Sequence, residues 1–313
     1  MKKQSFILLA LCAVILLFLS ACDKTNSGDP DTFLVSISDD VLNEGSKIVY
    51  NTSKTEFTLS YAPTLQKKAA PAAGRDFWVA ETEINYGLWK EISDWAVEND
   101  YILAQFAQPG SDVSFSSSHP VTRVCWYDAV VWCNALTEYF NNHNGDRTDY
   151  SYAYLVGGEP IRNAEIKNTD FEIMRVNTSA TGFRIPTNDE WYIAASWGGV
   201  PDNYASGASG AFGDEISTGA VAWYRKNSDM KTHPVAGKQA NNLGLYDMSG
   251  NVSEIVFDLL DMYYGKSNIR GGAWNSNPEE VSVTASHPTE EHTSSYSVGF
   301  RIVRTPGDEP SAK

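Results

Sequence analysis

Two short segments near the C-terminus constrain the fold of this chain most. Residues 269–274 read IRGGAW and residues 298–303 read VGFRIV, and both combine glycine, aromatic and β-branched residues, as short strands that end in tight turns do. The sequence between them, residues 276–296 (SNPEEVSVTASHPTEEHTSSY), contains no Lys, Arg or Cys and almost no large apolar residue. This pattern predicts a scaffold that fixes both ends of a displayed polar segment, which favours recognition over catalysis.

The N-terminus has the features of a processing signal. Lys2 and Lys3 precede an apolar run at residues 7–19, which is too short to span a membrane comfortably. The run ends in Leu-Ser-Ala before Cys22, and this resembles the lipobox of bacterial lipoproteins. The resemblance implies removal of residues 1–21, lipidation of Cys22 and a location in a bacterial cell envelope, at the outer membrane or cell surface. An ordinary secretory leader is the alternative.

The charge of the chain excludes one class of partner. Without residues 1–21, 22 basic residues stand against 39 acidic ones, a net charge of −17. Such a chain is repelled by nucleic-acid phosphates and by anionic lipid surfaces. We therefore expect no nucleic-acid partner, and membrane attachment through the lipid alone.

The rest of the chain divides by composition into four parts. Residues 22–32 are polar and predict a tether, and residues 33–74 contain alternating apolar runs that predict strands, followed by a linker. Residues 75–305 predict one compact domain, and residues 306–313 a tail.

Helical spacing is clear in only a few places. Apolar residues recur at helical intervals in residues 85–96 and 127–140, the first behind Asn85 as a cap. A shorter helix is expected over residues 187–197, where Thr187 begins a capping box. Few helices, short strands and long loops predict an α+β fold with its sheet near the C-terminus.

Five segments that follow one another in order carry a family resemblance. Together they resemble the formylglycine-generating-enzyme (sulfatase-modifying factor) domain over about residues 75–305, and this implies a C-type-lectin-like α+β fold. The five segments are HPVTRVCWYDAVVWCN (119–134), GFRIPTNDEWYIAA (182–195), NNLGLYDMSGNVSEIVFD (241–258), IRGGAW (269–274) and VGFRIVR (298–304).

The same resemblance implies a calcium site. Asn241, Asn242, Asp247, Asn251 and Glu254 offer side-chain oxygens in one loop, the ligand type that a hard cation prefers. Because the family binds calcium in this neighbourhood, Asn251 and Glu254 are the implied ligands. Hydrogen bonding within the loop, without a metal, is the alternative.

The residues that the family's enzymes need are missing. The oxidising members use a pair of reactive cysteines in the C-terminal segment, but this chain has no cysteine after Cys133. Cys125 and Cys133 lie in an upstream segment, where we expect buried free thiols; a disulfide remains open. The iron-dependent members need a histidine-rich site, and the five histidines here lack the required spacing. We therefore expect no enzymatic activity; an oxidase or oxygenase with an unrecognised metal site, and a structural subunit of an envelope assembly, are the alternatives.

A second resemblance concerns the displayed segment. The chain resembles the variable proteins of diversity-generating retroelements, which use this fold to present a mutable ligand-binding surface, here at residues 274–298. A fixed loop is the alternative. Glutamates in the segment favour a ligand with a basic or polar surface, most readily a protein. The expected ligand-binding residues are Trp274, Asn277, Glu279, Ser286, His287, Thr289, Glu290, Glu291, His292, Ser294 and Tyr296.

Overall fold

The computed structural model describes most of the chain after the tether. The described residues are 35–37, 43–63, 75–103, 107–143, 149–165, 174–257, 266–290 and 293–307. The processing signal, Cys22, the tether and residues 308–313 lie outside them. Among the described residues, none of the helices is both long enough and apolar enough to cross a membrane.

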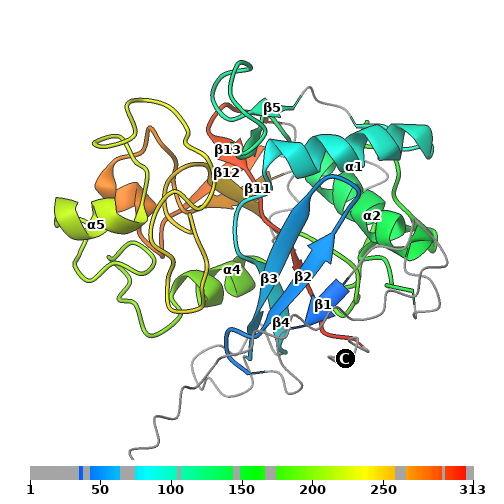
Figure 1. Ribbon diagram of the computed structural model, residues 1–313, viewed down its shortest axis with the longest axis horizontal. Helices are drawn as coiled ribbons and strands as arrows, with labels where there is room; N and C mark the ends of the chain where they lie inside the picture. Colours follow the sequence, from blue (N-terminus) through cyan, green and yellow to red (C-terminus); the bar gives the residue numbers. More distant parts are fainter. Residues whose placement is uncertain are drawn as a thin grey trace, which may run out of the picture. The chain divides into compact units, whose positions relative to one another are not determined.

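The N-terminal strands join the first strand of the predicted domain in a five-stranded sheet, in the order β1-β2-β3-β4-β14 (Figure 1). The strands are β1 (Val35–Ile37), β2 (Lys47–Asn51), β3 (Glu56–Ala62), β4 (Phe77–Ala80) and β14 (Val303–Arg304). The pair β3·β4 is antiparallel, with Leu59 opposite Ala80. A sheet was expected near the C-terminus, but this one is built mainly from N-terminal strands, because only β14 comes from the end of the chain.

The three predicted helices are confirmed. They are α1 (Tyr86–Glu98), α2 (Trp126–Asn142) and α4 (Asn188–Ala195). Asn85 caps α1 by accepting a hydrogen bond from the Leu88 amide at 2.9 Å, and Thr187 and Glu190 form the expected capping box of α4. Helices α1 and α2 pack together through the stacked rings of Trp89 and Trp132, whose centroids are 5.5 Å apart. A further helix, α5 (Glu215–Val221), was not predicted, because it is short and contains a glycine and three β-branched residues.

A four-stranded sheet lies in the C-terminal part, in the order β12-β11-β10-β13. Its strands are β10 (Ser253–Val256), β11 (Lys266–Arg270), β12 (Ser286–Glu290) and β13 (Val298–Gly299). Strand β13 pairs parallel to β10, and the other pairs are antiparallel. The two segments that first marked the sequence therefore lie in this sheet, on either side of β10.

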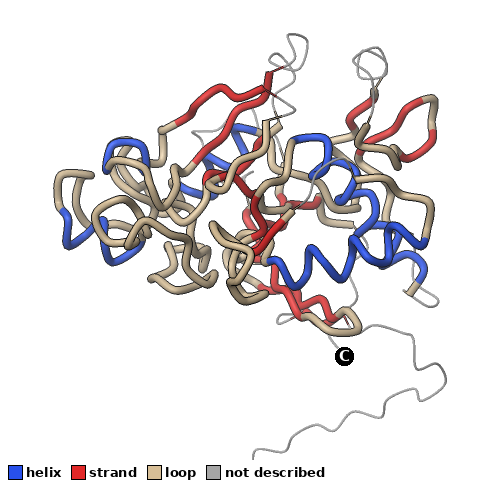
Figure 2. Tube along the Cα trace, turned by 90° about the horizontal axis from the view of Figure 1, so that it is seen from above, coloured by secondary structure: helices blue, strands red, loops and turns tan. Residues whose placement is uncertain are grey.

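Two smaller sheets and long loops complete the described chain. Strands β5 (Gln108–Pro109) and β6 (Val121–Thr122) form one pair, and β7 (Tyr154–Val156), β8 (Glu159–Pro160) and β9 (Arg175–Val176) form a three-stranded sheet. The chain between α5 and β10 contains no helix or strand, and Figure 2 shows how much of the described chain is loop. An α+β fold with few helices, short strands and long ordered loops is confirmed.

Glycines allow the two marked segments to approach the backbone of other segments closely. Gly272 has a φ of +66°, and a Cβ atom there would lie 2.4 Å from the Glu280 carbonyl oxygen. A Cβ atom on Gly299 would lie 2.5 Å from the carbonyl oxygen of Val121 in β6. No side chain fits at these distances, so both glycines are required by backbone packing.

Candidate functional site: a displayed segment held by a buried polar cluster

The displayed segment, residues 276–296, is attached at its N-terminal end through Trp274. The Trp274 amide donates to the Asn251 carbonyl oxygen at 2.9 Å, and the Trp274 carbonyl oxygen accepts a hydrogen bond from the Ser228 hydroxyl at 2.6 Å. Just beyond it, the amide of Arg225 donates to the Ser276 carbonyl oxygen at 3.1 Å. These bonds fix the point at which the segment leaves the body of the protein.

The first part of the displayed segment is less exposed than its composition indicated. Asn277 precedes the 3-10 helix η2 (Pro278–Val281), and its backbone N–H donates to the Glu280 carboxylate at 2.6 Å. Val281 and Val283 are completely buried in two different apolar clusters. The expectation of a wholly displayed segment is therefore wrong here, because these two valines anchor its middle in the core. Asn277 and Glu279 remain exposed.

The second part forms the edge strand β12. Ser286, His287 and Glu290 are exposed, and Thr289 is partly buried. The strand pairs with β11 in a register that places His287 opposite Ile269. Among the described residues β12 pairs only with β11, so it is an edge strand, and its exposed side chains are available to another molecule. Glu291 and His292 lie outside the described residues.

The last part brings Trp274 and Tyr296 together. The Trp274 indole Nε1–H donates to the Tyr296 carbonyl oxygen at 3.2 Å, and Tyr296 is 50% exposed. The guanidinium carbon of Arg123 lies 5.1 Å from the centroid of the Tyr296 ring, within cation–π distance. Ser294, nearby in the chain, is partly buried.

The predicted ligand-binding residues do not all lie together. Strands β12 and β13 are at opposite edges of the four-stranded sheet, with β11 and β10 between them. At about 4.8 Å per strand, these edges are about 14 Å apart. Tyr296 lies two residues before β13 and is hydrogen-bonded to Trp274. This aromatic pair and β12 therefore form two contact areas, not one.

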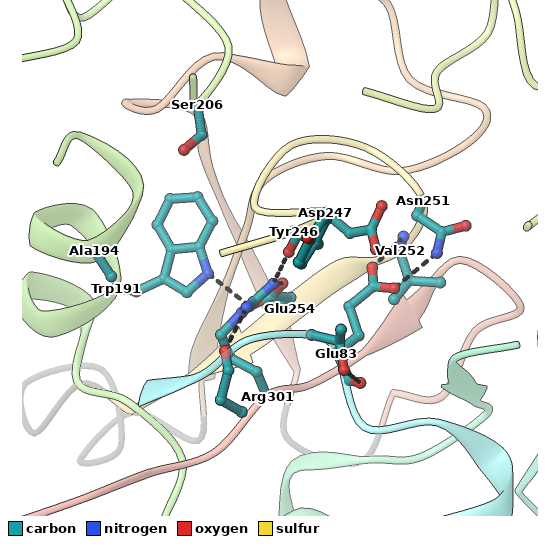
Figure 3. Close-up of polar contacts among 12 residues, drawn as sticks. Glu83, Trp191, Ala194, Ser206, Tyr246, Asp247, Asn251, Val252, Glu254 and Arg301 are labelled. Carbon is teal, nitrogen blue, oxygen red and sulfur yellow. Dashed lines mark hydrogen bonds and ion pairs between the residues drawn. The ribbon is translucent and has the colours of Figure 1, made fainter. Parts of the chain in front are cut away.

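A buried ion pair connects the second marked segment, residues 298–303, with β10. Glu254 in β10 accepts hydrogen bonds from Arg301 Nε and Nη2, both at 2.6 Å, and both side chains are at most 1% exposed. The Trp191 indole Nε1–H of α4 donates to the same carboxylate at 2.7 Å (Figure 3). Arg301 also donates to the carbonyl oxygens of Ala80 and Tyr246, both at 2.9 Å. One arginine thus joins β10, the loop before it and the end of β4.

A second carboxylate extends this network. Glu83 is buried, accepting hydrogen bonds from the Asn251 side chain at 2.7 Å and the Val252 amide at 2.9 Å. Asp247 accepts from the Ala236 amide at 2.7 Å, and its other oxygen, Oδ1, has no hydrogen-bond partner among the described residues. Figure 3 shows the carboxyl groups of Glu83 and Asp247 beside each other. We call Glu83, Trp191, Asp247, Asn251, Glu254 and Arg301 the frame cluster.

Burial changes the acidity of the two carboxyls in the frame cluster that Arg301 does not contact directly. Burial, together with the charges of Asp247 and Glu254, raises the pKa of Glu83 well above its ordinary value. Burial raises the pKa of Asp247 to about 6, and the nearby Glu254 charge adds to this effect. The raised pKa values favour the protonated, uncharged form of these carboxyls, which lowers the number of buried negative charges.

The residues implied as calcium ligands have other partners in this structure. The Asn251 side-chain oxygen accepts from the His233 amide at 2.9 Å, and both carboxylate oxygens of Glu254 accept from Arg301. Among the described residues, no group of three or more His, Cys, Asp and Glu side chains is arranged to hold a metal ion. The geometry agrees with hydrogen bonding within the loop, and calcium binding stays a prediction.

The two cysteines of the body are free and buried, as expected. Cys125 caps α2, and its thiol lies 3.2 Å from an oxygen of Asp128. Burial, and then the Asp128 charge, raises the pKa of Cys125 to about 12. Burial also raises the pKa of Cys133. Both groups therefore stay protonated near neutral pH, and a protonated thiol is a poor nucleophile and a poor metal ligand.

The sequence matches the family described as the sulfatase-modifying factor enzyme 1-like domain over residues 35–306. This chain belongs to that family. The match includes the N-terminal strands, in agreement with their place in the five-stranded sheet. A relative of nearly equal length is the "Chaperone protein LppX" of Paenibacillus barcinonensis, 27% identical over 314 residues, covering 92% of this chain and 94% of that protein.

Two solved structures of this fold are similar to the chain. Treponema denticola variable protein 1 has a TM-score of 0.63 and 25% identity, covering 83% of this chain and 99% of its own. CarF has a TM-score of 0.58 and 28% identity, covering 74% of this chain and 87% of its own. Both predicted resemblances, to the family and to its variable proteins, are thereby confirmed.

Two parts of the site were not singled out in the sequence. Glu83 lies outside the marked segments, and only its contact with Asn251 in the folded structure shows that it belongs to the site. Arg123 lies inside a family segment, between Thr122 and Val124, which are both buried. An arginine between Thr122 and Val124 in an otherwise largely apolar stretch was the available signal.

Proposed function

We propose that this protein binds a ligand, most readily another protein, through the displayed segment, and that a lipid on Cys22 holds it at the surface of a bacterial cell. The observation that carries the proposal is the contrast within one sheet: all four residues of β10 are buried, whereas three of the four predicted contact residues in β12, an edge strand of the described sheet, are exposed polar side chains. Exposed polar and aromatic side chains on a rigid support suit adaptable recognition.

The relatives support this proposal. The full-length similarity to a variable protein favours a role in ligand binding. The relative that covers 92% of the chain is named a chaperone protein, which favours a protein as the ligand. The segment Leu-Ser-Ala-Cys at residues 19–22 supports the lipid anchor.

The test of ligand binding uses two variants with equal numbers of substitutions. One carries Ser286→Ala, His287→Ala, Thr289→Ala and Glu290→Ala; the control carries Lys54→Ala, Glu56→Ala, Lys90→Ala and Asp94→Ala, all at exposed positions. Each immobilised protein is incubated with a cell-surface extract, and a captured protein is purified and titrated. Binding that the control keeps and the first variant loses supports the proposal; equal binding by both variants contradicts it.

The proposal includes the absence of thiol-based catalysis. With the pKa of Cys125 raised to about 12 by burial, native protein at pH 7.5 is expected to react with iodoacetamide far more slowly than unfolded protein. Mass spectrometry measures the modified fraction. Modification of either thiol in the folded protein at the unfolded rate would favour an enzymatic role instead.

The lipid anchor has its own test. Replacement of Cys22 by serine is expected to move the protein from the membrane fraction to the soluble fraction and to abolish incorporation of labelled palmitate. A Cys12→Ser variant is the matched control, since Cys12 lies within the segment that processing removes. Unchanged fractionation of the Cys22→Ser variant would exclude the anchor.

A further inference from the structure

Arg123 has a backbone conformation that arginine rarely adopts. Its φ is +57°, in the left-handed region, where a side chain crowds the backbone. It lies between β6 and α2, and its amide donates to the Ser295 carbonyl oxygen at 3.0 Å. Residues held in such conformations are often found at functional sites, so the contacts of the Arg123 side chain are of interest.

The guanidinium of Arg123 is available to a ligand. Its guanidinium carbon lies over the Tyr296 ring, 5.1 Å from the centroid, and the group makes no hydrogen bond or ion pair with any described residue. A guanidinium that contacts a ring through its face keeps the N–H donors at its edge available for hydrogen bonds. The group therefore combines a fixed position with unused hydrogen-bond donors.

Two further cations without a described partner lie in the loop beside Trp274. Arg225 is exposed, and its amide contacts Ser276; Lys231 is exposed, and its amide donates to Ser228, whose hydroxyl contacts Trp274. Neither side chain forms an ion pair with any described residue.

Acidic residues also lie near this loop, and one of them is paired. Lys226 pairs with Glu215, and Glu279 lies near enough to Lys226 to interact with it. Asp229 is exposed in the same loop. Arg123 nevertheless lies against Tyr296 without an acidic partner among the described residues, in a chain whose net charge is −15.

We propose that Arg123, Trp274 and Tyr296 form an anchor subsite that binds a carboxylate of an acidic protein segment. Arg123 donates to the carboxylate, and the two aromatic rings contact a neighbouring apolar side chain of the ligand. This rests on the proposed function and makes it specific. It also revises the expectation of a basic ligand surface for this part of the site, because that expectation counted the glutamates of the segment without Arg123.

The subsite can be tested without the natural ligand, using two short probes. They are acetyl-Glu-Glu-Phe-Glu-Glu-amide and acetyl-Lys-Lys-Phe-Lys-Lys-amide, added to the full chain while the indole N–H signal of Trp274 is followed by NMR. A Trp274→Phe variant assigns that signal. We expect the acidic peptide to shift it, with an affinity that falls as salt is added, and the basic peptide to leave it unchanged. No shift with the acidic peptide, or an equal shift with the basic one, overturns the subsite.

Variants separate binding from structure. Arg123→Gln is expected to weaken the acidic peptide about tenfold, and Arg123→Lys less. Arg123→Gly removes the same donors but relieves the backbone conformation, so it should lower affinity without lowering the thermal unfolding midpoint. Lys54→Gln, which removes an exposed positive charge elsewhere, should leave the affinity unchanged. Unchanged affinity in Arg123→Gln overturns the role of Arg123.

Two more results distinguish the possible failures. Sodium sulfate at matched ionic strength presents an anion without side chains; a shift of the Trp274 signal equal to that from the acidic peptide would exclude an acidic protein segment as the specific occupant. A captured ligand whose affinity depends on the exposed residues of β12 but not on Arg123 would retain the proposed function and overturn the anchor subsite.

Discussion

Arg301 of the frame cluster lies five residues after the displayed segment in sequence, yet the side chains of the two regions are held in opposite ways. Glu254 and Arg301 are almost completely buried and bonded to each other and to groups from several elements. Ser286 and His287 in β12 are exposed. The comparison shows that buried polar residues contribute to stability when they are hydrogen-bonded, whereas exposed polar residues remain available for binding.

The largest effect is expected from breaking the frame cluster. Arg301→Met leaves the Glu254 carboxylate buried without its partner, which should lower the free energy of unfolding by about 3–5 kcal/mol. Urea denaturation measures this. Arg225→Met, at an exposed position, is the control and should change the free energy of unfolding by no more than about 0.5 kcal/mol. Similar losses in both variants would show that the cluster has no special role.

A smaller effect is expected from pH. Because the pKa of Asp247 is about 6 in the folded protein, against about 4 when unfolded, the folded state holds more protons between these values. The contribution of Asp247 to stability therefore falls as pH rises from about 4 to about 6, by up to about 3 kcal/mol. Glu83, with its raised pKa, extends the loss to higher pH.

Asp247→Asn makes this pH effect measurable. The free energy of unfolding of the wild type, minus that of the variant, should decrease as pH rises from 4 to 7, because the variant has no charge to bury at this position. Denaturation at a series of pH values gives the difference. A difference that stays constant or increases with pH would contradict the raised pKa of Asp247.

The junction between the two regions should show an intermediate effect. Trp274→Phe keeps an aromatic ring but removes the indole donor to the Tyr296 carbonyl oxygen, at a cost of about 1 kcal/mol. Thermal unfolding followed by calorimetry measures this cost. A loss as large as that of Arg301→Met would place Trp274 functionally within the frame and not at its boundary.

The smallest effect is expected within the displayed segment. Single alanine substitutions of Ser286, His287 and Glu290 should each change the free energy of unfolding by less than about 0.5 kcal/mol, because these side chains are exposed. The matched contrast is Val283→Ala in the same segment, which should cost more than about 1 kcal/mol because Val283 is completely buried. Equal effects at all four positions would remove the distinction.

Local signals made much of the fold predictable. Asn85 and Thr187 mark the starts of two helices through caps that act over three residues, and the ordered segments were sufficient to identify the family. Helix α5 has no such apolar period and was missed. The joining of the N-terminal strands to β4 depends on pairing between residues far apart in sequence, which no local pattern encodes.

The site was less predictable for the same reason. The ends of the displayed segment could be located, but the division of its residues between two edges of a sheet follows from strand order. Val281 and Val283 looked like part of a polar segment, because two valines among polar residues are too few to indicate that this part of the chain is buried. Arg123 contacts Tyr296 across 173 positions of sequence, so only the folded chain brings them together.

The central claim is that the frame cluster determines the fold and that β12 is free to vary. It is tested most directly by the fraction of protease-resistant variants in two displayed libraries, one randomised at Ser286, His287, Thr289 and Glu290 and the other at Glu83, Trp191, Glu254 and Arg301. We predict that most members of the first library resist proteolysis as the wild type does, and that few members of the second do. Equal losses of resistance in the two libraries would contradict the claim.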